Sequence, residues 1–433
     1  MRVAGTPGRH DRYVVEGVYA AGTLGAADFD VTHPASLGIT ATATHRMQQA
    51  GFMQPVTADP IEILRQRSSE KWTAYPADVL PLFVAEMDYP LAPVIAQSLM
   101  ARIAASDTGY VGSSSTLPLA FAGFAERAWG WTVDPERVRT TTDVSVAIVE
   151  TLRQAISPGD AVVITPPVYP PFFDLIPEAG GVVAEVPLLD DGATWSIDLA
   201  GLERAFAAGA TAMLLCNPHN PVGLVHSRES LEAVALLADS YKVTVISDEI
   251  HGPLVHPGVH FSPYLSVSDA ARKRGVTVTS ASKGWNLAGL KCAIMVAGGK
   301  RGMRVLDRMP YEVAFRTSLF GLHASIAAFE HGEEWLDGAL ASITANRELL
   351  SSLLTELLPD VRYRMPDASY LAWLDFTAMG LGDDPSIRIL DEARVALNPG
   401  PTFGTEGRGF ARLNLACSPE VLSEAIMRMA LTL

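Results

Sequence analysis

The 433-residue chain is poor in cysteine, in basic residues and in long apolar runs. Its three cysteines cannot all pair and each lies beside apolar residues, which favours reduced core thiols and a cytoplasmic location. The 33 Lys and Arg residues against 48 Asp and Glu residues leave a net charge of −15, which argues against nucleic acid or an anionic membrane as a partner. No run of about 18 apolar residues is present that could cross a membrane, and the N-terminus lacks the apolar core of a signal peptide.

Two common ligand motifs are also missing. No H-E-x-x-H occurs, and prolines break any helix that would join His251, His256 and His260, so the sequence predicts no metal site. The glycine-rich stretch 298–302 lacks the spacing of a nucleotide-binding P-loop and is interpreted as a turn.

Composition divides the chain into an extension and a globular part. Residues 1–55 are rich in Ala, Gly and Thr, with poor hydrophobic periodicity, and we assign them no function. After them the pattern is that of a folded protein, and it includes a strand-like run at 79–85. We predict a segment of the smaller domain at 56–105, a large cofactor-binding domain at 106–310 and a smaller α+β domain at 311–433.

Short apolar runs without alternation indicate strands that are buried on both faces. Between them lie helical patterns; in one, Leu231, Val234 and Ala238 share a face and Ser227 offers an N-cap. Strand, helix and strand at this spacing predict an α/β fold, a mostly parallel sheet with helices on both faces that binds ligands at the carboxyl ends of its strands. The predicted strands are residues 161–165, 211–216, 243–247, 276–280 and 293–297.

One strand end carries an unusual group of polar residues. Ser280, Ser282 and Lys283 follow the run 276–279, and a second cation, Lys291, comes eight positions after Lys283. The Lys283 amine can form a Schiff base with an aldehyde cofactor, while the serines and Lys291 hold the phosphate of that cofactor. A surface lysine on a strand-to-helix loop is the alternative interpretation.

Other polar residues follow the neighbouring strands. Asn220 lies in a turn with two Asn-Pro pairs and can donate to a phenolate oxygen, whereas Asp248 at a buried strand end needs a cation, such as a protonated pyridine nitrogen. Tyr169, held between prolines, can stack on a flat cofactor, and the amides of Val144 and Ser145 at a helix start make an anion site. Each feature has a structural alternative: a turn, a solvated carboxylate, a core tyrosine or an ordinary helix start.

Together these stretches resemble the fold-type I pyridoxal-phosphate enzymes. Those are built like aspartate aminotransferases, with a mostly parallel seven-stranded sheet in a large domain and a smaller α+β C-terminal domain. Within that group the chain, from about residue 60 on, is similar to the MalY/PatB branch of cystathionine β-lyases and cysteine-S-conjugate β-lyases, including the actinobacterial-type C–S lyases. The motifs that carry the resemblance are Glu86-Met-Asp-Tyr, Gly109-Tyr-Val-Gly112, Asp248-Glu-Ile-His251, the stretch 282–291 and Gly409-Phe-Ala-Arg-Leu-Asn414.

The resemblance implies pyridoxal 5′-phosphate as the cofactor and a role for each matching residue. Lys283 would carry the cofactor and act as the base at the substrate Cα, while Asp248 would pair with the ring nitrogen and Tyr169 would stack on the ring. Asn220 would bond the phenolic oxygen and face the substrate, whose carboxylate Arg412 would hold as a fork. The other residues implied are Tyr89 on the substrate side, His251 beside the cofactor, and Val144, Ser145, Ser280, Ser282, Lys291 and the other subunit's Tyr110 around the phosphate.

The reaction that the resemblance implies is α,β-elimination of L-cystathionine or a related cysteine S-conjugate to a thiol such as homocysteine, pyruvate and ammonia. Because Tyr110 is expected to cross to a neighbouring active site, we expect a homodimer. An aminotransferase shares every residue up to the carbanion and stays open as the alternative, although His251 and the Trp285-Asn286 pair favour the lyase. A cofactor-binding regulator is disfavoured, because residues 1–55 lack a convincing helix-turn-helix.

Overall fold

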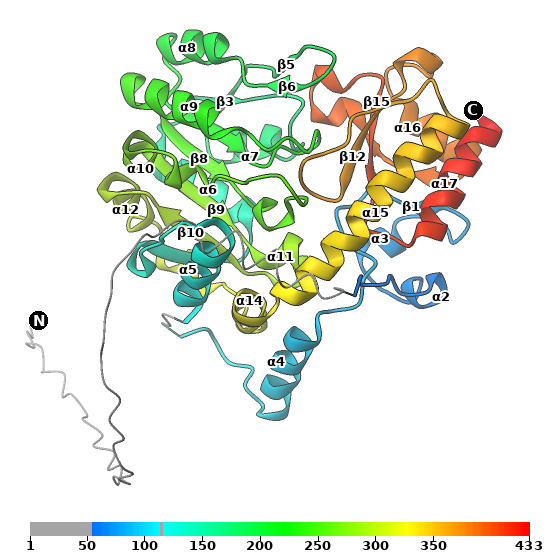
Figure 1. The fold of residues 1–433 in the computed structure, drawn as a ribbon. Coiled ribbons are helices and arrows are strands. Elements are labelled where there is room, and N and C mark those ends of the chain that lie inside the picture. Colours follow the sequence, from blue (N-terminus) through cyan, green and yellow to red (C-terminus); the bar gives the residue numbers. More distant parts are fainter. Residues whose placement is uncertain (1–53, 113–115) are drawn as a thin grey trace, which may run out of the picture. The chain divides into compact units, whose positions relative to one another are not determined.

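A computed structural model describes residues 54–112 and 116–433, so the predicted extension 1–55 lies almost entirely outside the described residues. A seven-stranded sheet and a four-stranded sheet organise the described part of the chain (Figure 1). Within these two ranges, no helix combines the length and the apolar character needed to span a membrane.

The large sheet confirms the predicted fold class. Its strand order is β2-β10-β9-β8-β7-β3-β4, and every neighbouring pair is parallel except the two pairs that β10 makes with β9 and β2. All the runs predicted as strands form strands of this sheet, with ends displaced by at most one residue. The strands are β2 (Val138–Thr141), β3 (Ala161–Ile164), β4 (Val182–Glu185), β7 (Ala212–Cys216), β8 (Thr244–Asp248), β9 (Gly275–Thr279) and β10 (Ala293–Ala297).

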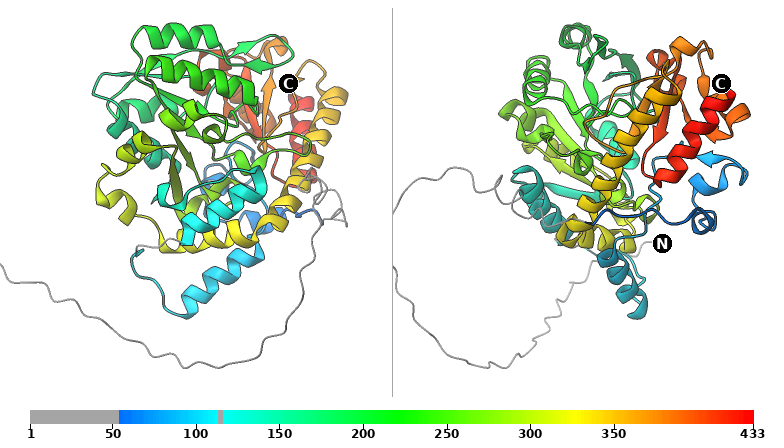
Figure 2. Two further views of the ribbon diagram at one scale, coloured as in Figure 1. Left: turned by 60° about the vertical axis from the view of Figure 1, so that its left-hand side comes forward. Right: turned by 45° about the vertical axis from the view of Figure 1, so that its right-hand side comes forward.

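Alternate side chains of these strands enter two different cores. Val162 and Leu214 pack on one face, and Val163 and Leu215 pack on the other, as the two-residue period of a strand requires. Helices cover both faces, so the central strands β7, β8, β9 and β10 are buried on both sides (Figure 2). One face carries α6 (Val144–Ala155), α7 (Phe172–Glu178) and α12 (Lys300–Leu306); the other carries α5 (Thr116–Trp129), α8 (Leu199–Ala207), α9 (Arg228–Tyr241) and α10 (Asp269–Arg274).

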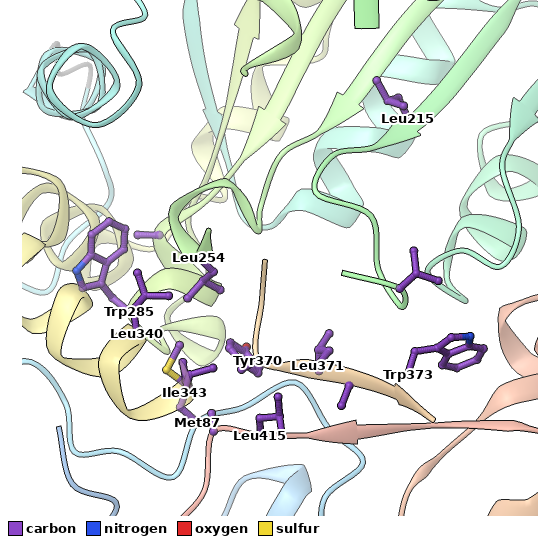
Figure 3. Packing of buried hydrophobic residues seen from close by; sticks show 14 of the residues in the cluster. Met87, Leu215, Leu254, Trp285, Leu340, Ile343, Tyr370, Leu371, Trp373 and Leu415 are labelled. Atoms are coloured by element: carbon purple, nitrogen blue, oxygen red, sulfur yellow. The ribbon is translucent and has the colours of Figure 1, made fainter. Parts of the chain in front are cut away.

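The C-terminal part of the chain builds the four-stranded antiparallel sheet, in the order β11-β12-β15-β14. Figure 3 shows that Leu371 and Trp373 of β12 belong to the same core as Leu340 and Ile343 of the long helix α15. The elements of this part are α13 (Tyr311–Phe315), α14 (Leu319–His331), α15 (Glu333–Leu357), β11 (Arg362–Tyr363), β12 (Leu371–Asp375), α16 (Pro385–Arg388), β14 (Asn398–Pro399), β15 (Phe410–Asn414) and α17 (Pro419–Thr432).

Residues near the start of the described chain join this C-terminal part. The two-residue strand β1 (Leu80–Pro81) pairs in parallel with β13 (Val395–Ala396). This pairing is in keeping with a segment 56–105 that contributes to the smaller domain, although the domain boundaries at 105 and 310 remain predictions. The preceding and following helices are α2 (Ile61–Leu64), α3 (Glu70–Thr73) and α4 (Pro93–Ala104).

The prediction of a strand across 79–85 is wrong beyond Pro81. After β1 the chain bends at Val84 and Ala85, and the carbonyl groups of residues 83–86 accept hydrogen bonds from side chains. Asn414 donates to the carbonyl of Val84 at 2.7 Å, for example. The apolar run is therefore an irregular segment, and we call residues 83–86 the N-terminal strap.

Candidate active site

The carboxyl ends of the central strands open into a cavity of about 570 Å³. Cys216 ends β7, Asp248 ends β8 and Ser280 follows β9, and all three line this cavity. Ligands of parallel sheets bind at this position. The predicted site residues that line the cavity are Val144, Ser145, Tyr169, Asn220, Asp248, His251, Ser280, Ser282, Lys283, Lys291 and Arg412.

A short helix, α11 (Ala281–Gly284), presents Lys283 to the cavity. Ser280 caps this helix, because its Oγ accepts a hydrogen bond from the Ser282 amide at 3.0 Å. The same hydroxyl donates to the carbonyl oxygen of Cys292 at 2.6 Å. The strand end, the helix start and the lysine are thereby held in one fixed turn.

The amine of Lys283 is held by a backbone carbonyl and is poorly solvated. Its Nζ donates to the carbonyl oxygen of Ala85 at 3.0 Å. Burial lowers the pKa of Lys283 to about 8, with the Arg412 charge adding to the shift and the carboxylates of Glu86 and Asp248 opposing it. The amine is thus available in the neutral form that a nucleophile or a base requires.

Asp248 is a buried carboxylate that lacks a cation of its own. It is 4% exposed and its Oδ1 accepts a hydrogen bond from the Ile250 amide at 3.1 Å. Burial raises the pKa of Asp248 to about 7, against the opposing effects of that amide and of Lys283. No ion pair to Asp248 exists among the described residues, so a cation supplied by a ligand fits this wall of the cavity.

Arg412 of β15 is a buried cation that pairs with no carboxylate among the described residues. Its Nη1 donates to Asn220 Oδ1 at 3.0 Å and its Nη2 donates to the carbonyl oxygen of Phe83 at 3.1 Å. The Nε atom is buried without a hydrogen-bond partner in the described part of the chain, and the guanidinium lies over the ring of Phe403. Burial lowers the pKa of Arg412 to about 10, so it stays charged at neutral pH and can take a ligand carboxylate.

The N-terminus of α6 forms the anion-binding end of the cavity. The first amides of a helix have no acceptor within the helix. The Asp143 side chain accepts from the Val146 amide at 2.9 Å, which leaves the amides of Val144 and Ser145 available to an anion. Lys291 adds a positive charge here and lies 3.2 Å from Asp143. Free helix amides and a nearby cation suit a phosphate group.

His251 and Tyr169 line the cavity as uncharged groups. His251 is 4% exposed, its Nδ1 lies 3.0 Å from Ser369 Oγ, and burial lowers its pKa to about 3, with Lys283 and Arg412 adding to the shift. Burial raises the pKa of Tyr169, so its phenol stays protonated. That either ring contacts the cofactor stays a prediction.

The structure does not bring Tyr89 to this cavity. Tyr89 is 2% exposed and lines a different cavity, together with Ser342 and Cys417. The reason lies at Asp88, whose amide donates to the carbonyl oxygen of Ala416 at 2.8 Å and turns the following residue into the core. The predicted contact of Tyr89 with the substrate stays a prediction.

Tyr110 lies on the surface and not in the cavity of its own chain. It is 83% exposed, and its ring stacks on Phe315 with centroids 4.8 Å apart. Its predicted contact with a phosphate in another subunit stays a prediction.

The sequence did not identify the N-terminal strap as part of the site. Phe83, Val84, Ala85 and Glu86 all line the cavity, and their backbone accepts hydrogen bonds from residues far along the chain. The motif that begins at Glu86 was the only signal that could have identified it, because the apolar run before it has the composition of an ordinary strand.

Comparison with known proteins places this architecture in a family. The family described as Aminotransferase class I and II matches residues 77–429. The chain belongs to this family.

Several relatives within the family are named lyases, and more distant ones are named aminotransferases. A protein named putative cystathionine beta-lyase from Mycobacterium leprae is 43% identical over 87% of this chain and 97% of its own length. Cystathionine beta-lyase PatB from Bacillus subtilis is 35% identical over 81% of this chain and 92% of its own. The crystal structure of a putative PLP-dependent beta-cystathionase from Corynebacterium diphtheriae has a TM-score of 0.82 and 35% identity, and covers 87% of this chain and 98% of its own. The predicted resemblance to the MalY/PatB branch is confirmed.

Proposed function

We propose that this protein is a pyridoxal-phosphate-dependent carbon–sulfur β-lyase. It eliminates a thiol, such as homocysteine, from L-cystathionine or a related cysteine S-conjugate and leaves pyruvate and ammonia. The observation that carries the proposal is the convergence of Lys283, Asp248 and Arg412 on one cavity, each without an opposite charge paired to it in the described residues. The relatives named cystathionine beta-lyase support the reaction.

The residues of the cavity fit this cofactor. The unpaired Asp248 carboxylate suits a protonated ring nitrogen, and Asn220 and His251 are available for the phenolic side of the ring. Tyr169 would stack on the ring. When bound, pyridoxal phosphate supplies an electron sink for the negative charge that develops at the substrate Cα. The phosphate would be held by Ser280, Ser282, Lys291 and the amides of Val144 and Ser145.

Lys283 serves as the base. Its Nζ is neutral above a pKa of about 8 and partly neutral below it, so it can take the proton from the substrate Cα. The Cβ–S bond then breaks and the sulfur leaves with the bonding electron pair, to be protonated as a thiol. The released enamine hydrolyses in water to pyruvate and ammonia.

Arg412 orients the substrate for this step. A guanidinium binds a carboxylate through two parallel hydrogen bonds, which fixes the plane of the substrate α-carboxylate and hence the direction of the Cα–H bond. The hydrogen bond from Arg412 to Asn220 supports such an orientation, because it links the carboxylate anchor to the cofactor side of the cavity.

We further infer a cytoplasmic homodimer whose homocysteine product enters methionine biosynthesis. Exposed apolar side chains on α4, α5 and α13 and in the segments beside α4 support the dimer, since exposed apolar surface of this kind is typical of a protein interface. They are Leu91, Met100, Ile103, Tyr110, Leu119 and Tyr311.

The proposal is tested with purified protein, pyridoxal phosphate and L-cystathionine, without any 2-oxo acid. Pyruvate and free thiol are followed together. Equal amounts of both over many turnovers support the β-lyase. A single turnover that resumes only after a 2-oxo acid is added identifies an aminotransferase and overturns the proposal.

A further inference from the structure

The cavity wall contains two carboxylates to which the proposed reaction gives no role. Glu86, in the N-terminal strap, is half-buried, and Glu70, the first residue of α3, is exposed. Both line the same cavity as Lys283 and Arg412.

Neither carboxylate pairs with another side chain in the part of the chain that the structure describes. No Lys, Arg or His nitrogen of the described residues forms an ion pair with Glu70 or Glu86, and neither side chain has a hydrogen-bond partner there. Asp88, only two positions after Glu86, shows the contrast, because it is 1% exposed and pairs with Lys71 at 2.8 Å. Both carboxylates are therefore available to a ligand in the cavity.

The N-terminal strap holds Glu86 in place. Ala85 accepts hydrogen bonds from Lys283 at 3.0 Å and from Tyr370 at 2.9 Å, and the carbonyl of Glu86 itself accepts from Asn414 at 2.6 Å. Glu86 lines the cavity beside Lys283, and its negative charge opposes the lowering of the Lys283 pKa that burial causes.

We propose that Glu86 and Glu70 form a subsite for a second ammonium group on the substrate, carried by the part that leaves with the sulfur. The inference rests on the proposed function. In that reaction the α-carboxylate has Arg412 and the α-amine is used at the cofactor, so a further cation must come from the sulfur-linked part. The subsite selects cysteine S-conjugates that bear an amine there, as L-cystathionine does and S-methyl-L-cysteine does not.

Binding to the holoenzyme tests the subsite without turnover. The probes are 2,7-diaminosuberate, in which a methylene replaces the sulfur of cystathionine, and 2-aminosuberate, which lacks the second amine. Dissociation constants come from the change in the visible absorbance of the cofactor. We expect the diamino compound to bind about tenfold more tightly, and this preference to weaken as ionic strength rises.

Variants assign the preference to the carboxylates. Glu86→Gln should remove most of the preference, Glu86→Asp should retain part of it, and Glu70→Gln should reduce it by about two- to threefold, because Glu70 is exposed. Glu62→Gln, at an exposed carboxylate of α2 outside the cavity, is the matched control and should keep it. In turnover assays, the ratio of kcat/KM for L-cystathionine to kcat/KM for S-methyl-L-cysteine should follow the same pattern. It should fall most in Glu86→Gln, less in Glu86→Asp and Glu70→Gln, and stay unchanged in Glu62→Gln.

Equal affinity of the wild type for the two probes overturns the subsite. So does an unchanged ratio in Glu86→Gln with both dissociation constants shifted together, which means that Glu86 acts on Lys283 alone. If Glu86→Gln does not fold, the ratio of the two dissociation constants in Glu70→Gln, a variant at an exposed residue, still decides. Wild-type protein that makes no pyruvate from either substrate overturns the proposed lyase instead, and the two probe affinities then still decide the subsite.

Discussion

Lys283 Nζ donates a hydrogen bond of 3.0 Å to the carbonyl oxygen of Ala85, 198 positions earlier in the chain. Tyr370, the residue directly before β12, donates to the same oxygen. A backbone carbonyl orients an amine without adding a full negative charge, so it leaves the pKa of Lys283 near the value of about 8 that burial produces. The strap, the short helix α11 and Tyr370 beside β12 therefore place the reactive amine together.

Replacing Lys283 by alanine should abolish the visible absorbance of the bound cofactor and lower cystathionine turnover by about 10³-fold or more. The physical reason is that one amine both carries the cofactor and takes the Cα proton. Absorbance spectra and pyruvate release are measured on the purified variants. Lys300→Ala, at an exposed lysine of α12, is the control and should behave as the wild type. A Lys283→Ala protein that keeps the band and turns over would contradict the assignment.

Replacing Asp248 by asparagine should stabilise the cofactor-free protein and weaken the holoenzyme. Burial raises the pKa of Asp248 from 3.8 to about 7. Because the pKa of Asp248 is higher in the folded than in the unfolded chain, the residue contributes most to the free energy of unfolding at pH below about 4. This contribution is lost as the pH rises through about 7. At pH 8 the cofactor-free variant should gain about 1 to 4 kcal/mol of unfolding free energy, a difference that closes toward pH 4.

When the cofactor is present, the same substitution should have the opposite effect on stability. Asparagine cannot balance a protonated ring nitrogen, so the variant should gain less stability from pyridoxal phosphate and lose about 10²-fold in turnover. Thermal melts at two pH values, with and without cofactor, measure both effects. A variant that is less stable than the wild type without cofactor would count against an unpaired carboxylate at this position.

Replacing Arg412 by lysine should raise KM for L-cystathionine more than it lowers kcat, with kcat/KM falling by roughly 30-fold or more. Lysine keeps the charge but cannot form the fork on a carboxylate or reach Asn220 and Phe83 at once. Arg408→Lys, at an exposed arginine just before β15, is the matched control. Unchanged KM in Arg412→Lys would place the carboxylate anchor elsewhere.

Replacing His251 by asparagine should leave the acid limb of the pH–rate profile where it is. Burial lowers the pKa of His251 to about 3, so the ring is neutral throughout the range in which the enzyme is assayed. The activity itself can fall, because asparagine alters the contact with Ser369. A limb that moves or disappears in the variant would show that His251 titrates near neutral pH.

Mixing two inactive variants tests the predicted contribution of Tyr110 across subunits. If Tyr110 serves the partner's site, a dimer of one Tyr110→Ala chain and one Lys283→Ala chain has one complete site. Co-refolded equal amounts should recover up to about a quarter of wild-type activity, because half of the dimers are mixed and each has one whole site. No recovery above the two separate variants would indicate that Tyr110 acts within its own chain or not at all.

The large sheet and the residues at its strand ends could be predicted from the sequence. The runs that form β3, β7, β8, β9 and β10 are short, apolar and separated by helical patterns, and these local signals are strong enough to decide the fold. Because parallel strands point their carboxyl ends to one edge, the polar residues that follow them were bound to meet. Lys283 and Asp248 were found in this way.

The remaining features depended on how the two sheets pack. Arg412 meets Asn220 across 192 positions, and Glu86 enters the cavity because Lys283 of α11 and Asn414 of β15 bind the strap. Tyr89, three residues after Glu86, enters the core instead. Sequence alone determined which residues end the strands, since that depends on local patterns of apolar residues. Only the tertiary structure decided which side chains of the strap face the cavity, since that depends on hydrogen bonds between segments far apart in the chain.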